Sequence, residues 1–159
     1  MTIPAKLQTY LRDHQARWDV VEHGRTATSA QTVRVAGIPA QCLAKSVLLA
    51  DDDGYLVVVL PAGSRVHLGN RHRQLNRQVR LATEADAGRL FDDCEPGAIP
   101  ALGQAYGVPT IVDDALMAQP EIYFEAGDHT ELIHMSGSQF SDLMAGARHG
   151  HFVVDRRDS

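Results

Sequence analysis

The stretch CLAKSVLLA (residues 42–50), DDDG (51–54) and YLVVVL (55–60) decides the fold of this chain. Two apolar runs of strand length flank an Asp-Gly pair, which favours a tight hairpin turn because both residues tolerate positive φ. The stretch therefore predicts a β-hairpin with strands at Cys42–Ala50 and Tyr55–Leu60. Both strands are apolar on their two faces, which predicts that they lie in the centre of a sheet.

Helices and shorter strands are predicted on either side of this hairpin. Thr28 or Ser29, Thr83 and Ser136 are typical N-caps, and Ser136 with Gln139 predicts a capping box. Residues Ala30, Val33 and Ala36 predict an apolar stripe on the second helix, with Gly37 as its stop. The predicted helices cover residues 4–16, 28–37, 67–76, 83–91 and 136–144. The predicted strands cover residues 18–22, 42–50, 55–60, 78–81, 110–112, 121–126 and 130–135.

The composition is typical of one soluble globular domain. The chain has 159 residues, of which 44% are hydrophobic and 22% charged, so we expect a single domain over residues 1–159 with a real core. The apolar run at Tyr55–Leu60 is far shorter than the roughly 20 residues of a membrane helix, and the N-terminus lacks a signal-peptide pattern. We therefore expect a cytoplasmic location and no membrane partner.

Charge is unevenly distributed along the chain. The net charge of −5 is unfavourable for a nucleic-acid ligand, because phosphate contacts supply most non-specific affinity. Residues 62–82, however, contain no acidic residue and carry a basic set: Arg65, His67, Arg71, His72, Arg73, Arg77 and Arg80. This segment is either a solvated helix face balanced by the acidic residues that follow it, or a surface that faces RNA.

A lone lysine stands near the start of the first hairpin strand. Alternation along the strand places Lys45, Val47 and Leu49 on one face, so Lys45 begins a line of buried side chains. Its ammonium group either reaches the sheet edge or projects into a cavity to meet an anion or an ester. The residue type alone favours the sheet edge, because lysine is mostly exposed.

A second candidate feature is the loop CEPGAIPALG (94–103). Gly97 permits close approach of another backbone, while Pro96 and Pro100 stiffen the loop. Preorganised backbone N–H groups stabilise the negative charge that develops on a carbonyl oxygen during ester hydrolysis. The alternative is an ordinary surface loop, which this composition also fits.

Other kinds of catalytic site are not indicated. His129 and His134 are five residues apart and would face opposite sides of one strand, so they do not predict paired metal ligands. Without a HExxH motif or a cysteine pair, neither a metal nor another cofactor is expected. Cys42 and Cys94 form no CxxC motif and are expected to stay reduced, and neither has the adjacent histidine that activates a thiol.

Four segments in this order resemble the YbaK family, also called the prolyl-tRNA-synthetase-associated editing domain, whose members hydrolyse wrongly charged aminoacyl-tRNA. The segments are AKS (44–46), EPGAIPALG (95–103), VPTIVD (108–113), and IYFEAGDH (122–129) followed by IHMS (133–136). The resemblance extends from about His23 to Leu143. It implies an α+β fold with a mixed, barrel-like sheet and flanking helices.

The resemblance also implies roles for individual residues. Lys45 takes the family's catalytic position, and the substrate-binding positions fall on Gly97, Ala98, Ile99, Pro100, Ala101, Gly127 and His129. The family loop is usually written GxxxP, whereas this chain has Ala101 in place of that proline and Pro100 one position earlier. The resemblance favours a tRNA-facing role for Arg71, Arg73 and Arg77.

The expected partner is an aminoacyl-tRNA carrying a small amino acid, with no DNA partner. The implied activity is that of a free-standing aminoacyl-tRNA deacylase. Two alternatives stay open: a non-catalytic module that uses the pocket for a nucleotide, an amino acid or a protein partner, and a different small-molecule hydrolase on the same scaffold. The Ala101 departure keeps the binding-module alternative open.

Overall fold

The computed structural model describes residues 3–26, 28–52, 54–66, 79–95, 98–150 and 153–155. The strands are β1 (Asp19–Glu22), β2 (Leu43–Asp51), β3 (Gly54–Pro61), β4 (Ser64–Val66), β5 (Arg80–Leu81), β6 (Thr110–Asp113), β7 (Glu121–Glu125), β8 (Glu131–Ser136), β9 (Arg148–Gly150) and β10 (Val153–Asp155). The α-helices are α1 (Ala5–Asp13), α2 (Ser29–Ala36), α4 (Glu84–Leu90), α5 (Asp114–Met117) and α6 (Gly137–Leu143), and the 3₁₀-helices are η1 (Ala40–Cys42) and η2 (Gly103–Tyr106).

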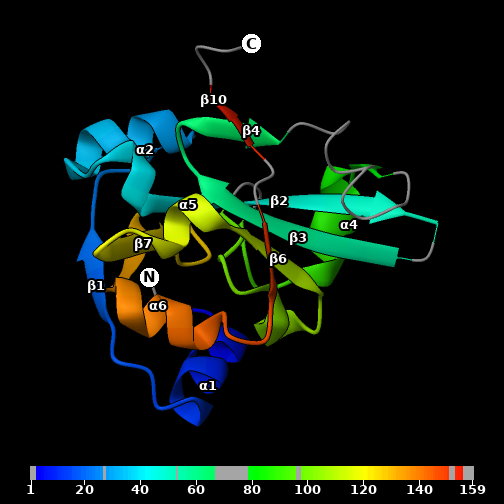
Figure 1. The fold of residues 1–159 in the computed structure, drawn as a ribbon, viewed down its shortest axis with the longest axis horizontal. Coiled ribbons are helices and arrows are strands. Elements are labelled where there is room, and N and C mark those ends of the chain that lie inside the picture. Colours follow the sequence, from blue (N-terminus) through cyan, green and yellow to red (C-terminus); the bar gives the residue numbers. More distant parts are fainter. Residues whose placement is uncertain are drawn as a thin grey trace.

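The predicted hairpin forms the centre of the sheet. Strands β2 and β3 pair antiparallel from Ala44 opposite Pro61 to Asp51 opposite Gly54. The Asp51 carboxylate accepts a hydrogen bond from the Gly54 N–H at 2.9 Å, which closes the turn. Figure 1 shows the two strands crossing the middle of the molecule. The predictions of the hairpin and of its central position are both confirmed.

The main sheet has eight strands and mixes parallel and antiparallel pairs. Its order is β1-β8-β7-β2-β3-β6-β9, and β5 pairs additionally with β2. The pairs β2–β7, β3–β6 and β6–β9 are parallel, whereas β1–β8, β7–β8, β2–β3 and β2–β5 are antiparallel. The predicted α+β fold with a mixed sheet and flanking helices is confirmed.

One side of β2 has two strand neighbours that leave a gap between them. Strand β7 pairs with β2 only at Leu43 and Ala44, and β5 pairs with it only at Leu49 and Ala50. A further hydrogen bond joins the Ala82 N–H to the Leu48 carbonyl oxygen. Within the described part of the chain, no strand pairs with Lys45–Val47 on this side. We call this interruption the sheet gap.

The two faces of the sheet contact different apolar clusters. The larger cluster contains Ala44 and Leu48 of β2 together with side chains from three helices: Leu7 and Leu11 of α1, Leu116 of α5, and Phe140 and Leu143 of α6. The smaller cluster contains Leu49 of β2, with Val47 packed against it. In Figure 1, α5 and α6 lie side by side and α1 lies at the lower end of the molecule. The alternation predicted for β2 is therefore observed.

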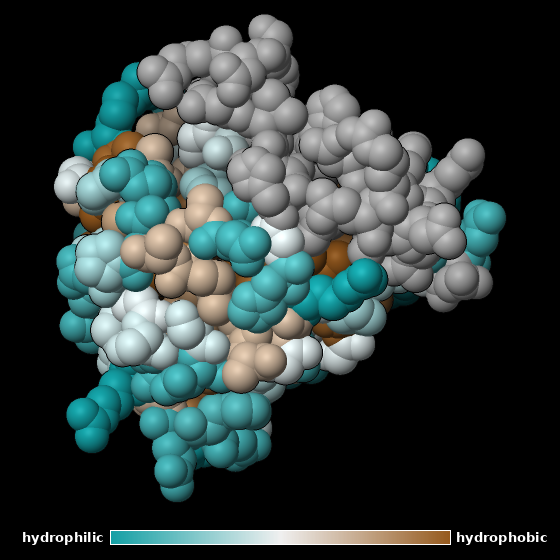
Figure 2. Space-filling view, in the orientation of Figure 1, coloured by the Kyte–Doolittle hydropathy of each residue, from teal (hydrophilic) through white to brown (hydrophobic). Residues whose placement is uncertain are grey.

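Hydrophilic residues dominate the coloured part of the face shown in Figure 2, and hydrophobic residues gather there in small separate patches. The central strands lie beneath this surface, since Val57, Val58 and Val59 are fully buried. Their long apolar run is therefore explained by their position inside the domain.

Three local predictions need correction. Ser136 caps α6 through the Gln139 N–H, but the Gln139 side chain accepts from the Arg17 N–H at 2.9 Å, so the reciprocal bond of a capping box is missing. A complete capping box lies instead at Thr83 and Asp86, because the shorter Asp side chain folds back onto the Thr83 N–H. The strand predicted at 42–50 is observed at Leu43–Asp51, one residue later at each end. The predicted helix at 67–76 lies outside the described residues and stays a prediction.

The third correction concerns α2. Its predicted apolar stripe is only partly buried, and the one buried residue of the helix is Thr32. Thr32 is fully buried because its hydroxyl group has polar partners inside the protein. A buried hydroxyl that is hydrogen-bonded costs little free energy, so residue polarity alone does not identify the inner face of this helix.

Gly137, at the start of α6, gives a test of this packing. A Cβ atom there would fall on the Gln119 carbonyl oxygen, well inside van der Waals contact, whereas a Cβ on Gly88 of α4 meets nothing within 4 Å. Gly137→Ala should therefore lower the free energy of unfolding by about 2 kcal/mol through overpacking. Gly88→Ala, the matched control, should raise it by about 0.5–1 kcal/mol through helix propensity. Urea denaturation of both variants measures the difference, and equal effects would contradict the packing of α6.

Candidate functional site

Lys45 lies in the sheet gap, and its neighbour Ser46 makes the contact that closes the gap. The Ser46 hydroxyl donates a hydrogen bond to the Pro100 carbonyl oxygen at 3.0 Å. Because side chains alternate along a strand, the half-buried Lys45 leaves β2 on the opposite face, together with Val47 and Leu49. The predicted loop is thus held against β2 by Ser46, while Lys45 starts from the other face of the same strand.

Backbone hydrogen bonds also join this loop to the turn between β7 and β8. The Glu95 N–H donates to the Gly127 carbonyl oxygen at 2.7 Å, and the Gly127 N–H donates to the Ala98 carbonyl oxygen at 3.2 Å. Gly127 has φ +94°, and a Cβ there would overlap the Pro4 ring. The structure therefore brings two of the predicted site segments together, although they are about thirty residues apart in the sequence.

The available backbone donors of the loop are fewer than the sequence predicts. The Ala98 N–H already donates to the Glu95 carbonyl oxygen at 3.1 Å, and Pro100 has no N–H group. Among the described positions of the predicted set, this leaves the N–H groups of Ile99 and Ala101. Gly97 lies outside the described residues, as do Arg71, Arg73 and Arg77, so the roles of these four residues stay predictions.

A buried carboxyl group that the sequence did not single out lies at the end of β7. Glu125 Oε1 lies 3.3 Å from Thr32 Oγ1, which in turn lies 2.6 Å from Thr26 Oγ1 and 3.1 Å from the Thr28 carbonyl oxygen. Burial raises the pKa of Glu125 to about 7; the Thr32 hydrogen bond lowers the pKa, and the charge of Asp128 raises it again. Glu125 thus exchanges a proton near neutral pH.

Asp128 shapes the turn and the electrostatics around it. Its Oδ1 atom accepts hydrogen bonds from the N–H and hydroxyl groups of Thr130, both at 2.8 Å, and from the Glu131 N–H at 3.1 Å. Asp128 is 2% exposed, and its charge raises the pKa of Glu125. A second buried carboxylate therefore lies close to Glu125.

Glu95 completes this group from the loop side. Its Oε1 atom accepts from Arg25 Nη2 at 2.6 Å. The Arg25 hydrogen bond lowers the pKa of Glu95, and burial opposes this change. His129 is 9% exposed, and its carbonyl oxygen accepts from the Thr26 N–H at 3.2 Å. We call Glu95, Glu125 and Asp128 the acidic cluster.

The other candidate residues lie away from the acidic cluster or are unreactive at neutral pH. His134 is on β8 and contacts Asp19 and Glu121 at 2.7 and 3.0 Å, away from His129. Burial raises the pKa of the Cys94 thiol to about 12, although the Tyr106 hydrogen bond lowers it. Cys94 is therefore a poor nucleophile at neutral pH. Within the described ranges, no three His, Cys, Asp or Glu side chains form a group that could hold a metal ion.

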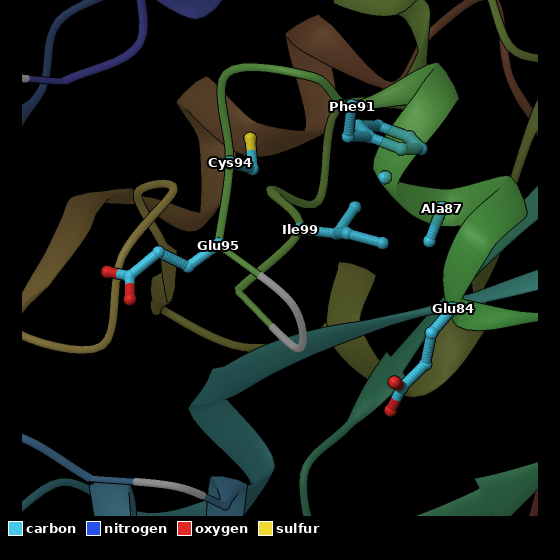
Figure 3. A pocket seen from close by; sticks show the side chains of 7 residues that line it. Glu84, Ala87, Phe91, Cys94, Glu95 and Ile99 are labelled. Atoms are coloured by element: carbon cyan, nitrogen blue, oxygen red, sulfur yellow. The ribbon is translucent and has the colours of Figure 1, made fainter.

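A small hollow lies on the other side of the loop, between the loop and α4. Its volume is about 50 Å³, and its lining is mainly apolar: Glu84, Ala87, Gly88, Phe91, Cys94, Glu95 and Ile99. Figure 3 shows Ala87, Phe91 and Ile99 around its centre, with Glu84 and Glu95 directing their carboxylates away from that centre. The carboxylate of Glu95 therefore belongs to the acidic cluster, and the aliphatic part of the same side chain lines the hollow.

Comparison with known families identifies the domain. A family model for the aminoacyl-tRNA editing domain matches residues 23–143. The chain belongs to this family. Membership implies aminoacyl-tRNA as substrate and aminoacyl-tRNA deacylase activity. The match includes Lys45, the loop and the acidic cluster, so every described part of the candidate site lies within the editing domain.

Solved structures share the fold of this editing domain. One neighbour is a hypothetical protein with a TM-score of 0.83 and 19% identity, over 94% of this chain and 99% of that chain. A second, provisionally described as a trans-editing enzyme for prolyl-tRNA synthetase, has a TM-score of 0.81 and 21% identity, over 92% and 94% of the two chains. A third, from Marinobacter aquaeolei VT8 and provisionally described as a signal transduction protein, has a TM-score of 0.77 and 25% identity, over 97% of this chain and 31% of that chain.

No curated protein matches the sequence significantly. Among the helices of the described residues, none is long and apolar enough to cross a membrane. The family assignment comes from the editing-domain match over residues 23–143.

The buried Glu125 predicts how the editing domain responds to pH. Its pKa rises from an ordinary 4.5 to about 7 in the folded protein, so the folded state holds a proton that the unfolded state releases between these values. Stability from this group is complete below pH 4.5 and is lost as the pH rises through 7. The difference in free energy of unfolding between Glu125→Gln and wild type should therefore shift by about 3 kcal/mol in favour of the variant between pH 4 and pH 8.

Urea denaturation at the two pH values measures this change. Glu22→Gln, an exposed substitution on β1, is the matched control for removing one carboxylate. The same Glu125→Gln effect at both pH values would show that Glu125 ionises normally in the folded protein.

Proposed function

We propose that this editing domain acts in trans as a free-standing hydrolase that deacylates mischarged tRNA carrying a small amino acid. The observation that carries the proposal is the editing-domain match over residues 23–143, which spans all described site segments. The neighbour provisionally described as a trans-editing enzyme for prolyl-tRNA synthetase, with a TM-score of 0.81, supports action in trans.

The proposed reaction is hydrolysis of the ester between the amino acid and the terminal ribose. The oxygen of a water molecule bonds to the ester carbonyl carbon, the bond from that carbon to the ribose oxygen breaks, and the water proton ends on the ribose oxygen. Negative charge builds on the carbonyl oxygen in the transition state, and preorganised N–H donors stabilise it. The amides of Ile99 and Ala101, with Gly97, are the proposed donors, and a ribose hydroxyl group or an ordered water is the proposed base.

Lys45 has a separate proposed role on β2. Its ammonium group would hold the polar end of the substrate, where ribose and phosphate oxygens are the acceptors. Two observations support this role: Lys45 lies within the editing-domain match, and it leaves β2 on the face opposite the Ser46 contact with the loop. Gly127 and His129 would line the rim, since Gly127 is bonded to both Glu95 and Ala98 of the loop.

Restricted space supports a small amino acid. The Ser46 hydrogen bond holds the loop against β2, and Ala98 and Ala101 are fully buried in the loop. Closely packed backbone does not open for a large side chain without breaking these contacts. Alanine, serine, cysteine and proline are therefore the amino acids to test.

The test of the proposal is hydrolysis of alanyl-, seryl-, cysteinyl- and prolyl-tRNA by the purified protein. We expect at least one of these esters to decay faster than in buffer alone. If all four decay at the buffer rate while the protein still binds tRNA, the alternative of a non-catalytic binding module replaces the proposal.

Lys45→Ala tests the proposal that the Lys45 ammonium group anchors the substrate. Loss of a charged hydrogen bond in the transition state should cost about 3 kcal/mol, or about a hundredfold in kcat/KM. The chain has one other lysine, Lys6, which lies on α1 and contacts Asp92 at 3.3 Å. Lys6→Ala is thus the matched control and should keep wild-type activity. Wild-type turnover by a folded Lys45→Ala protein would eliminate the proposed role of Lys45.

A further inference from the structure

The acidic cluster contains more acceptor atoms than the protein satisfies. Three of its oxygen atoms, Glu95 Oε2, Glu125 Oε2 and Asp128 Oδ2, are inaccessible to solvent and have no hydrogen-bond partner among the described residues. Buried polar atoms in folded proteins are nearly always hydrogen-bonded, because each unsatisfied group costs free energy. Each of these three atoms therefore needs a donor, which either an ordered water or a bound ligand supplies.

The three residues lie close together although they come from two segments. Glu125 ends β7, Asp128 lies in the turn that follows, and Glu95 is bonded through its N–H to Gly127 between them. The charge of Asp128 raises the pKa of both Glu125 and Glu95. Asp128 is 2% exposed, so its unpartnered oxygen lies inside the protein.

The charge of the cluster selects the kind of donor. Its one described ion pair is between Glu95 and Arg25, and the Arg25 side chain is 62% exposed. The Arg25 charge also acts on Asp128, whereas the charge that acts on Glu125 is the negative charge of Asp128, so the end of β7 carries negative potential at Glu125. An ammonium group fits this environment, since it carries one positive charge, has three N–H donors and accepts no hydrogen bond.

We propose, building on the deacylase function above, that Glu125 and Asp128 bind the α-ammonium group of the aminoacyl substrate. This group is present on every primary aminoacyl ester, whatever its side chain. The two carboxylates would therefore recognise an aminoacyl ester as a class, while the rest of the pocket selects the amino acid. Glu95, held by Arg25, adds a third acceptor at the loop.

The position of the cluster also orients the ester. The α-nitrogen of an amino acid is two bonds from its carbonyl carbon, so anchoring the nitrogen at Glu125 and Asp128 fixes the carbonyl nearby. The loop residues Glu95 and Ala98 are bonded to Gly127, which lies between these carboxylates in the sequence. The carbonyl oxygen would then lie beside the loop amides that the proposed reaction requires.

A binding experiment tests this inference without relying on catalysis. The probes are two non-hydrolysable analogues of the tRNA end, 3′-deoxy-3′-(alanylamino)adenosine and 3′-deoxy-3′-(lactylamino)adenosine. They have nearly the same shape, but the second replaces the ammonium group by a hydroxyl group. Calorimetry should show that wild type binds the alanyl analogue about tenfold to a hundredfold more tightly than the lactyl analogue.

Glu125→Gln should abolish this preference and leave the affinity for the lactyl analogue unchanged. The glutamine keeps an oxygen that accepts from Thr32, so the local hydrogen bond survives. Glu121→Gln, on the same strand but exposed and bonded to His134, should keep the full preference. Asp128→Asn should weaken the preference as well, and circular dichroism checks its fold because Asp128 caps the turn.

Equal binding of the two analogues by wild type, or a preference that persists in Glu125→Gln, would overturn the inference. The outcome is independent of the proposed function. A protein that prefers the alanyl analogue but hydrolyses no ester confirms the ammonium site and refutes deacylation, whereas hydrolysis without the preference refutes the ammonium site alone.

Discussion

The interruption of strand pairing along β2 is the constraint on which the candidate site depends. Strands β7 and β5 share one side of β2 but pair with its two ends, so within the described residues Lys45–Val47 pairs with β3 on the other side and with no strand on this side. Backbone groups left in this way need other partners, and open strand edges are sites for ligands or additional chain segments. The loop that follows α4 approaches there through the hydrogen bond between Ser46 and Pro100.

The same arrangement explains why carboxyl groups are buried beside the gap. The parallel register of β2 and β7 ends at Ala44 and Phe124, and the next residues are Lys45 and Glu125. The chain then turns at Gly127, whose carbonyl and N–H groups both form hydrogen bonds with the loop. Burial of Glu125 costs stability at neutral pH, and such a cost is typical of groups retained for function rather than for folding.

Sequence reasoning predicted the framework well because the framework follows local rules. The Asp-Gly turn and the two-sided apolar strands placed the hairpin, and cap residues such as Thr83 placed the helix starts. Sequence also predicted the loop, Gly127 and His129 as site positions, and the structure brings the described ones together. Their functional roles stay predictions until the proposed experiments test them.

Two features of the candidate site could not be predicted from local sequence patterns. The alternation of side chains along β2 was predicted. Which face of β2 the loop covers could not be predicted, and this face decides that Ser46 rather than Lys45 contacts the loop. Glu125 looked like an ordinary polar residue in a half-buried strand, and Thr32 like a polar residue on a helix. Their burial results from contact between α2 and β7, which are 93 residues apart at this point. An acidic residue directly before the Gly127 turn was the one available signal.

The most direct test of the central claim is a crystal structure of the protein with 3′-deoxy-3′-(alanylamino)adenosine bound. The account predicts that the ligand lies at the sheet gap, with its amino nitrogen within hydrogen-bond distance of Glu125 and Asp128 and its carbonyl oxygen facing the loop amides. A ligand bound instead in the hollow between α4 and the loop, with Glu125 Oε2 and Asp128 Oδ2 still lacking a donor, would contradict it.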